Sequence, residues 1–215
     1  GETLAKLPEN SDIILNLNDP ADEETYKFSE WVKAGKNIML GAGKETTETL
    51  KSWIDTAKEE NFQYVLLDYG WYGPELDNRC DPRLDPTKLE PDDGDSPELA
   101  AAKQLMKQYI VGDGHFKHTV GFPPYGKIDE VDPNGFAPDL DMKAVCEYAN
   151  SQGIGMILYV NDRHLFDTFG RYTVDELFAR FKEWGAAGVK PGFVQCRDQK
   201  YEKRLREMIE AAAKY

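Results

Sequence analysis

The sequence predicts an α/β fold, a partial TIM-type (β/α) barrel of about four β/α units that carries an inserted helix and a long loop. Short apolar runs typical of strands alternate with longer amphipathic stretches typical of helices, which favours parallel strand pairing with the helices outside. The strand runs are almost continuously apolar, as expected when both faces of a sheet are covered. A doubly wound sheet fits the same alternation, but "GAGKETTE" (41–48) lacks the third glycine of a dinucleotide-binding turn.

The first two units come before the long loop. "DIILNLN" (12–18) is strand-like, and "NIMLG" (37–41) is a short apolar run closed by glycine, as in a buried strand. Thr46 and Thr47 can cap a helix, because four apolar residues follow them at helical spacing. "QYVLLD" (63–68) is the next predicted strand.

An insertion at about 92–137 separates these units from the rest of the chain. Residues 97–110 within it are predicted to form a helix, with Pro97 in its first turn. Residues 111–139 are rich in Gly, Pro and Asp, which is typical of a loop. We expect one domain over residues 1–215 that contains this insertion.

Helices and strands then alternate to the end of the chain. Gly153 marks the end of one helix, and Thr173 the start of the next. The predicted segments are, in order, helix 139–153, strand 154–161, helix 174–185, strand 189–195 and helix 198–214.

Composition excludes several classes of partner. The formal net charge of -13 disfavours nucleic acid and anionic membranes, and no apolar run approaches the length of a membrane span. The three cysteines lie far apart without a CxxC spacing, so neither a disulfide framework nor a zinc site is expected. The three histidines lack supporting ligands, and we predict no metal site and no cofactor for this chain.

Polar and aromatic side chains gather where the predicted strands end. The carboxyl ends of barrel strands converge on one face, so these side chains should meet at one mouth. Carboxylates, amides and arginines can bind vicinal hydroxyls, and aromatic rings can cover the apolar face of a sugar. In the alternative interpretation the two rings plug the barrel top, and the polar groups cap turns and helices. The candidate substrate-binding residues are Asp68, Trp71, Tyr72, Glu75, Asn161, Arg163, Lys190 and Gln195.

Five stretches carry a resemblance to a known family. They are "DIILNLNDP" (12–20), "WVKAGK" (31–36), "YVLLDYGWYGPELD" (64–77), "DLDMKAVCEYANSQGIGMILYVNDR" (139–163) and "WGAAGVKPGFVQCRDQ" (184–199). Together they resemble the catalytic barrel of glycoside hydrolase family 97, whose characterised members are bacterial α-glucosidases and α-galactosidases. The resemblance covers about residues 12–215 apart from 92–137. It implies a periplasmic or secreted glycosidase that acts on oligosaccharides.

The sequence departs from the family pattern at the fourth predicted strand. Retaining members carry a nucleophilic Asp there, whereas this chain reads Lys190-Pro191-Gly192-Phe193, with Gly192 at the position of the carboxylate. A retaining mechanism needs two carboxyl groups about 5 Å apart, while an inverting mechanism with a separation of roughly 6.5–9.5 Å stays open in principle. We therefore assign no catalytic residue within this chain.

The resemblance also implies further barrel strands, which in the family carry the general acid, the base and calcium-binding glutamates. The favoured hypothesis is a glycoside hydrolase-like domain for α-glycosidic bonds whose catalytic machinery is incomplete in this chain. The alternatives are a non-catalytic carbohydrate-binding module on a degenerate barrel, and a purely structural domain. Calcium is expected only in the complete family enzyme.

A partial barrel would leave strand edges and barrel-facing side chains uncovered. We therefore expect self-association, a C-terminal half of the barrel supplied from outside this chain, or a core completed by residues 12–18 and 97–137. The chain starts at Gly1, which resembles the scar of a cleaved tag, so any export signal is expected to have been removed with it.

Overall fold

The chain divides into two compact units, Gly1–Ala34 and Gly35–Tyr215, and the strands and helices named here all belong to the second. The strand predicted over 12–18 lies outside the described residues, and the prediction of one domain stays a prediction. The computed structural model describes residues 31–41, 45–72, 81–83, 90–97, 100–101, 104, 110–111, 115–116, 140–166, 172–194 and 199–215.

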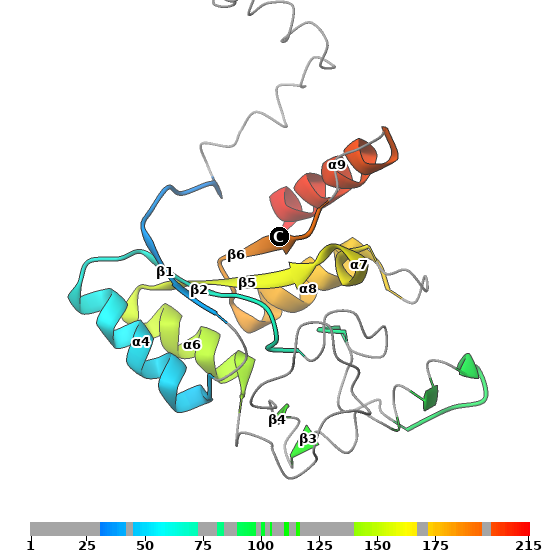
Figure 1. Cartoon of the computed structure of the whole chain (residues 1–215), viewed down its shortest axis with the longest axis horizontal. Coiled ribbons are helices and arrows are strands. Elements are labelled where there is room, and N and C mark those ends of the chain that lie inside the picture. Colours follow the sequence, from blue (N-terminus) through cyan, green and yellow to red (C-terminus); the bar gives the residue numbers. More distant parts are fainter. Residues whose placement is uncertain are drawn as a thin grey trace, which may run out of the picture. The chain divides into compact units, whose positions relative to one another are not determined.

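Four parallel strands form the central sheet of this second unit (Figure 1). They are β1 (Asn37–Leu40), β2 (Tyr64–Leu67), β5 (Gly155–Asn161) and β6 (Gly188–Gly192), and they lie in the order β1-β2-β5-β6. The predicted parallel α/β architecture is therefore confirmed. The order never reverses along these strands, whereas a doubly wound sheet reverses at its switch point.

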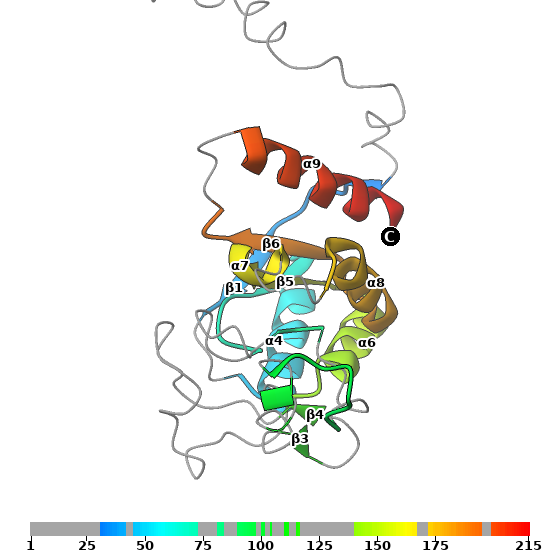
Figure 2. The same ribbon diagram turned by 90° about the vertical axis from the view of Figure 1, so that its right-hand side faces the viewer.

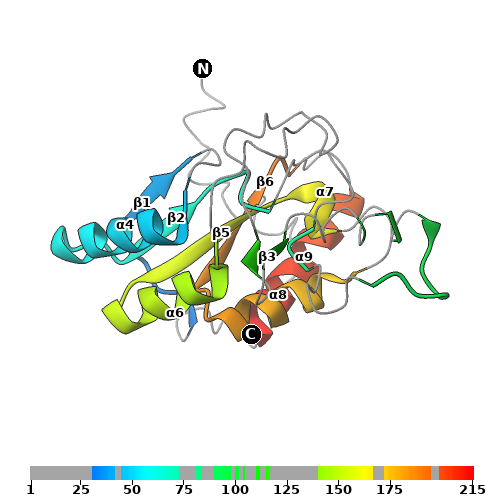
Figure 3. The same cartoon turned by 90° about the horizontal axis from the view of Figure 1, so that it is seen from below.

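Four helices follow the strands in the same progression. They are α4 (Thr47–Glu59), α6 (Met142–Gln152), α8 (Val174–Trp184) and α9 (Gln199–Lys214). Each packs against the next, α4 on α6, α6 on α8 and α8 on α9 (Figure 2, Figure 3). Because parallel crossovers are right-handed and the strands advance in one direction, successive helices reach the same face of the sheet.

Local signals in the sequence set the helix ends, and the caps at Thr46, Thr173 and Gly153 are those predicted. Thr46 and Thr173 each occupy an N-cap and form a capping box, the second with Glu176. Gly153 and Gly185 are C-caps in the left-handed region, with φ of 76° and 82°, where glycine carries no Cβ penalty.

The core lies between the sheet and the helices. Alternate strand residues such as Val65 and Leu158 are fully buried and belong to one cluster with the apolar helix residues. The intervening residues point to the opposite face, where Met39 of β1 is 60% exposed and Ile157 of β5 is half-buried. In the described part of the chain the helix-free face is therefore covered less completely than the other.

Two predicted elements differ from the structure at their ends. The helix predicted over 97–110 is wrong at its end, since Ile110–Val111 is a short strand, β3, that pairs antiparallel with β4 (His115–Phe116). Two β-branched residues before the sequence Gly-Asp-Gly favour a hairpin over a helix end. The strand predicted over 189–195 ends at Gly192, because Phe193 turns to a φ of 56°.

One element had no sequence signal. A single helical turn, α7 (Asp162–Leu165), follows directly after β5. Four residues are too few to produce a helical hydrophobic pattern, so periodicity could not predict it.

Candidate functional site

The carboxyl ends of β2, β5 and β6 bring polar side chains to one edge of the sheet. Asp68 directly follows β2, and its N–H donates to the carbonyl of Leu40 on β1 at 2.8 Å. The β5–β6 register places Tyr159 opposite Lys190 and Asn161 opposite Gly192. Parallel pairing therefore assembles groups that lie far apart along the chain.

An ion pair bridges two of these strands. The Lys190 ammonium donates to Asp68 Oδ2 at 2.9 Å, and the side chains are 37% and 12% exposed. Since β5 lies between β2 and β6, the bridge passes over Tyr159, whose ring centroid is 5.5 Å from Lys190 Nζ. The remaining carboxylate oxygen of Asp68 accepts from the N–H of Tyr69 at 3.0 Å. The site thus offers a strong donor and a strong acceptor side by side, partly open to solvent.

The predicted stacking rings, Trp71 and Tyr72, are each only 5% exposed. The Trp71 indole N–H donates to the carbonyl of Tyr159 at 2.8 Å. Its ring packs edge-on against Tyr72 and Trp184, and at a tilt against Phe181 of α8. Neither ring presents a free face, so their placement fits the alternative role of a plug beneath the mouth. Stacking on a sugar would require the rings to leave this cluster.

Asn161 is also built into the structure rather than turned to solvent. It is 2% exposed, its N–H donates to the Tyr72 hydroxyl at 2.9 Å, and its Oδ1 accepts from the Arg163 N–H at 3.0 Å as the N-cap of α7. The Tyr72 hydroxyl lies 3.2 Å from Nδ1 of His164, which is 1% exposed. Arg163 itself is exposed, so of this group it is the side chain free to meet a ligand.

A second ion pair, which the sequence did not indicate, lies in the segment 81–83. The Arg83 guanidinium makes two 2.9 Å bonds to the Asp81 carboxylate, and both side chains are almost fully buried. Arg83 also donates to the carbonyls of His164 and Thr173 and lies 5.2 Å from the Tyr172 ring centroid. It therefore ties the chain after β2 to α7 and to the start of α8. The sequence "CDPR" carries no sign of burial that could have predicted this role.

Asp162 is a buried carboxyl on the side that faces α9. It is 7% exposed, Oδ2 accepts from the Tyr201 hydroxyl at 3.1 Å, and Oδ1 has no hydrogen-bond partner within the described structure. Burial raises the pKa of this carboxyl, although the Tyr201 bond and the Arg204 charge act in the opposite direction. Both of these neighbours, Tyr201 and Arg204, lie on α9.

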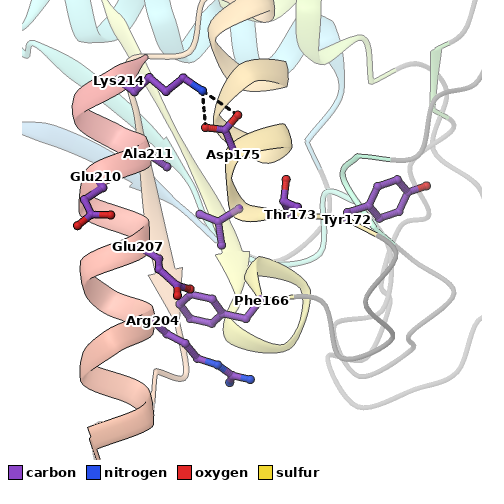
Figure 4. A pocket seen from close by; sticks show the side chains of 10 residues that line it. Phe166, Tyr172, Thr173, Asp175, Arg204, Glu207, Glu210, Ala211 and Lys214 are labelled. Carbon is purple, nitrogen blue, oxygen red and sulfur yellow. Dashed lines mark hydrogen bonds and ion pairs between the residues drawn. The ribbon is translucent and has the colours of Figure 1, made fainter.

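A cavity of about 540 Å³ lies between α9 and the segment leading into α8 (Figure 4). At one end Lys214 donates to both oxygens of Asp175, at 2.7 and 3.0 Å, and Tyr215 donates to one of them. These bonds lower the pKa of Asp175 and raise that of Lys214. None of the predicted substrate-binding residues lines this cavity. Its lining is Phe166, Tyr172, Thr173, Val174, Asp175, Arg204, Glu207, Glu210, Ala211 and Lys214.

Two predicted site residues, Glu75 and Gln195, lie outside the described residues. Among the side chains that the structure describes, no three His, Cys, Asp or Glu residues come together as metal ligands. The described helices include none with the length and apolar character needed to cross a membrane.

Comparison with known proteins identifies the family. The model of the family Glycoside hydrolase 97 matches residues 98–215, more than half of the chain, and includes part of the predicted insertion. The fold resembles that of a variant of a glycoside hydrolase family 97 enzyme from Pseudoalteromonas sp. strain K8, with a TM-score of 0.50 and 19% identity. That match covers 94% of this chain and 28% of the enzyme, so the chain spans less than a third of its length. A search of curated proteins gave no match. The chain belongs to glycoside hydrolase family 97.

Proposed function

We propose that the chain contributes the first β/α units of a (β/α)8 barrel in a glycosidase for α-glycosidic bonds of oligosaccharides. Membership of the family supports the reaction class. The unreversed order β1-β2-β5-β6 and the shared helix face support the barrel, because strands in a barrel advance around one axis with helices outside. By family resemblance alone, we extend the proposal to a periplasmic or secreted location.

Completion of the barrel requires strands from outside the four described here. β1 and β6 are the outer strands of the described sheet, and Met39 on the helix-free face is 60% exposed. Further barrel strands, whether from the same protein or from a second copy, would cover both the strand edges and this face. This fits the expectation of self-association or of a missing half of the barrel.

The observation that carries the sugar-binding proposal is the part-exposed Asp68–Lys190 pair at the carboxyl edge. A carboxylate accepts from one hydroxyl while an adjacent ammonium donates to the next, which matches the spacing of vicinal sugar hydroxyls. We assign these two residues to direct contact and Trp71 and Tyr72 to support. Asn161, which is 2% exposed, is also assigned to support. Binding by Arg163, Glu75 and Gln195 remains part of the proposal.

Catalysis is proposed to depend on carboxylates outside this chain. Gly192 can supply neither a nucleophile nor a base, and both glycosidase mechanisms need a pair of carboxyl groups flanking the bond. The same glycine favours the second candidate function, a non-catalytic carbohydrate-binding module. Calcium belongs to the complete family enzyme in this proposal, and no cofactor is assigned to this chain.

Hydrolysis of p-nitrophenyl α-glucoside and α-galactoside, together with calorimetric sugar binding, tests the proposal. The variants are Asp68→Ala and Lys190→Met, and the exposed helix residue Lys203 provides the matched control Lys203→Met. In a protein that also contains the proposed further barrel strands, turnover that both site variants abolish and the control retains supports an enzyme, whereas sugar binding without turnover supports the module. If no sugar binds at millimolar concentration, the chain is structural and the proposal fails.

A further inference from the structure

We propose that Gly192 provides the seat for the ring of Tyr159, and that the seated ring positions the Lys190 ammonium toward Asp68 for sugar binding. The role of Tyr159 in sugar binding rests on the proposed function, whereas the packing of its ring above Gly192 does not. From its sequence, Gly192 is the position that lacks the family's nucleophilic carboxylate, and no role was predicted for Tyr159.

Space, not backbone conformation, explains the glycine at 192. The positive-φ glycines of the described chain are Gly70, Gly153 and Gly185, so Gly192 adopts a conformation open to other residues. A Cβ built on Gly192, however, would overlap two ring carbons and the hydroxyl oxygen of Tyr159. No side chain fits at position 192 while the tyrosine ring stays where it is.

The strand register explains how the ring reaches this position. Tyr159 is directly opposite Lys190, while Gly192 lies two residues further toward the carboxyl edge. The ring therefore leans along the strand and across to β6, above the glycine. Its backbone is held from the other side, since the Trp71 indole donates to the Tyr159 carbonyl at 2.8 Å.

The seated ring in turn holds the lysine. Lys190 Nζ lies 5.5 Å from the ring centroid and 2.9 Å from Asp68 Oδ2, so the aromatic face and the carboxylate attract the same ammonium. A lysine side chain has four rotatable bonds and would otherwise sample solvent, since this one is 37% exposed. With Tyr159 only 3% exposed, we assign it as a positioning residue that acts through Lys190.

Five variants separate this role from simple packing. Tyr159→Phe keeps the aromatic face, Tyr159→Leu replaces it with an aliphatic side chain, and Gly192→Ala displaces the ring. Tyr159→Ala and Tyr159→Ala/Gly192→Ala complete a double-mutant cycle in which the ring is removed with and without a side chain at 192. Each is measured for thermal stability and for calorimetric binding of methyl α-glucoside and methyl α-galactoside.

We expect Tyr159→Phe to bind the sugars with an affinity within about threefold of the wild type. Tyr159→Leu and Gly192→Ala should bind them roughly tenfold more weakly, because loss of a cation–π contact can reduce affinity by about tenfold. The double variant should be more stable than the sum of the single substitutions predicts, because alanine at 192 no longer meets a ring. Its sugar affinity should stay as low as that of Tyr159→Leu.

Two results would overturn the inference. Additive stability effects of the two alanine substitutions would contradict the seat, and wild-type affinity in Tyr159→Leu or Gly192→Ala would contradict the positioning of Lys190. If the wild-type chain binds neither sugar, the proposed function and the positioning role fail together. The double-mutant cycle on stability still tests in that case whether Gly192 makes room for the Tyr159 ring, because it needs no ligand.

Discussion

Replacement of Asp81 by asparagine should destabilise the protein strongly, although the residue lies outside the described helices and strands. The substitution keeps the shape of the side chain and removes its charge. Arg83 then remains a buried cation whose fixed contacts are the carbonyls of His164 and Thr173. Neutral carbonyls do not offset the charge of a guanidinium as a bidentate carboxylate does.

The structure sets the magnitude of this effect. The Asp81 side chain is 0% exposed and that of Arg83 is 2% exposed, so solvent cannot screen the charge that is left behind. Breaking a buried ion pair by removal of one partner costs about 3–5 kcal/mol. Because native proteins are stable by only about 5–15 kcal/mol, the variant should lose a large part of its free energy of unfolding.

Urea denaturation followed by tryptophan fluorescence measures the loss, since Trp71 and Trp184 are buried reporters at 5% and 9% exposure. Asp175→Asn is the matched control, because it breaks the Lys214 pair, whose side chains are 58% and 49% exposed. Solvent screens that pair, and little change in stability is expected. The reasoning is refuted if Asp81→Asn costs no more than Asp175→Asn at an unchanged m-value.

Three further outcomes follow from buried or constrained groups. Burial, aided by nearby carboxylates, raises the pKa of the Cys146 thiol from 9.0 to about 12. Between these pH values the unfolded state binds fewer protons than the folded state, so the free energy of unfolding should fall as pH rises. The fall should be less steep in Cys146→Ala. Urea midpoints at several pH values check this, and equal slopes would contradict it. Gly153→Ala should lower the free energy of unfolding by about 1–2 kcal/mol, because the residue needs a φ near 80°. Gly185→Ala should cost more, because a Cβ there would also lie 2.5 Å from Asn150 Nδ2. Thermal melts compare the two variants, and identical midpoints would contradict the clash. Tyr72→Phe removes a hydroxyl that serves two buried groups and should cost about 1–3 kcal/mol by urea denaturation, with a loss well under 1 kcal/mol counting against the network.

The secondary structure was largely predictable because its signals are local. Apolar runs, the Thr46 and Thr173 caps and the stop at Gly153 each act within a few residues of one another. The predictions failed where the deciding contacts were not local. A four-residue helix after β5 produces no period, and the turn at Phe193 ends a strand that the apolar pattern would have continued.

The candidate site was only partly predictable. Asp68 and Lys190 were expected at a common mouth because parallel strands align their carboxyl ends, and the structure brings them within 2.9 Å of each other. The roles of Trp71 and Tyr72 could not be deduced, since composition cannot distinguish an aromatic ring that faces a ligand from one that faces a helix. Their 5% exposure depends on where α8 packs.

The sequence by itself determined the alternation of strands and helices, the helix caps and the family, because each depends on residues that are close together in the chain. Only the tertiary structure decided that Arg83 is buried with Asp81, and that Tyr159 occupies the space above Gly192. Such contacts join segments through register and packing, and the free energy of a buried charge or a filled space depends on neighbours that lie far away along the chain.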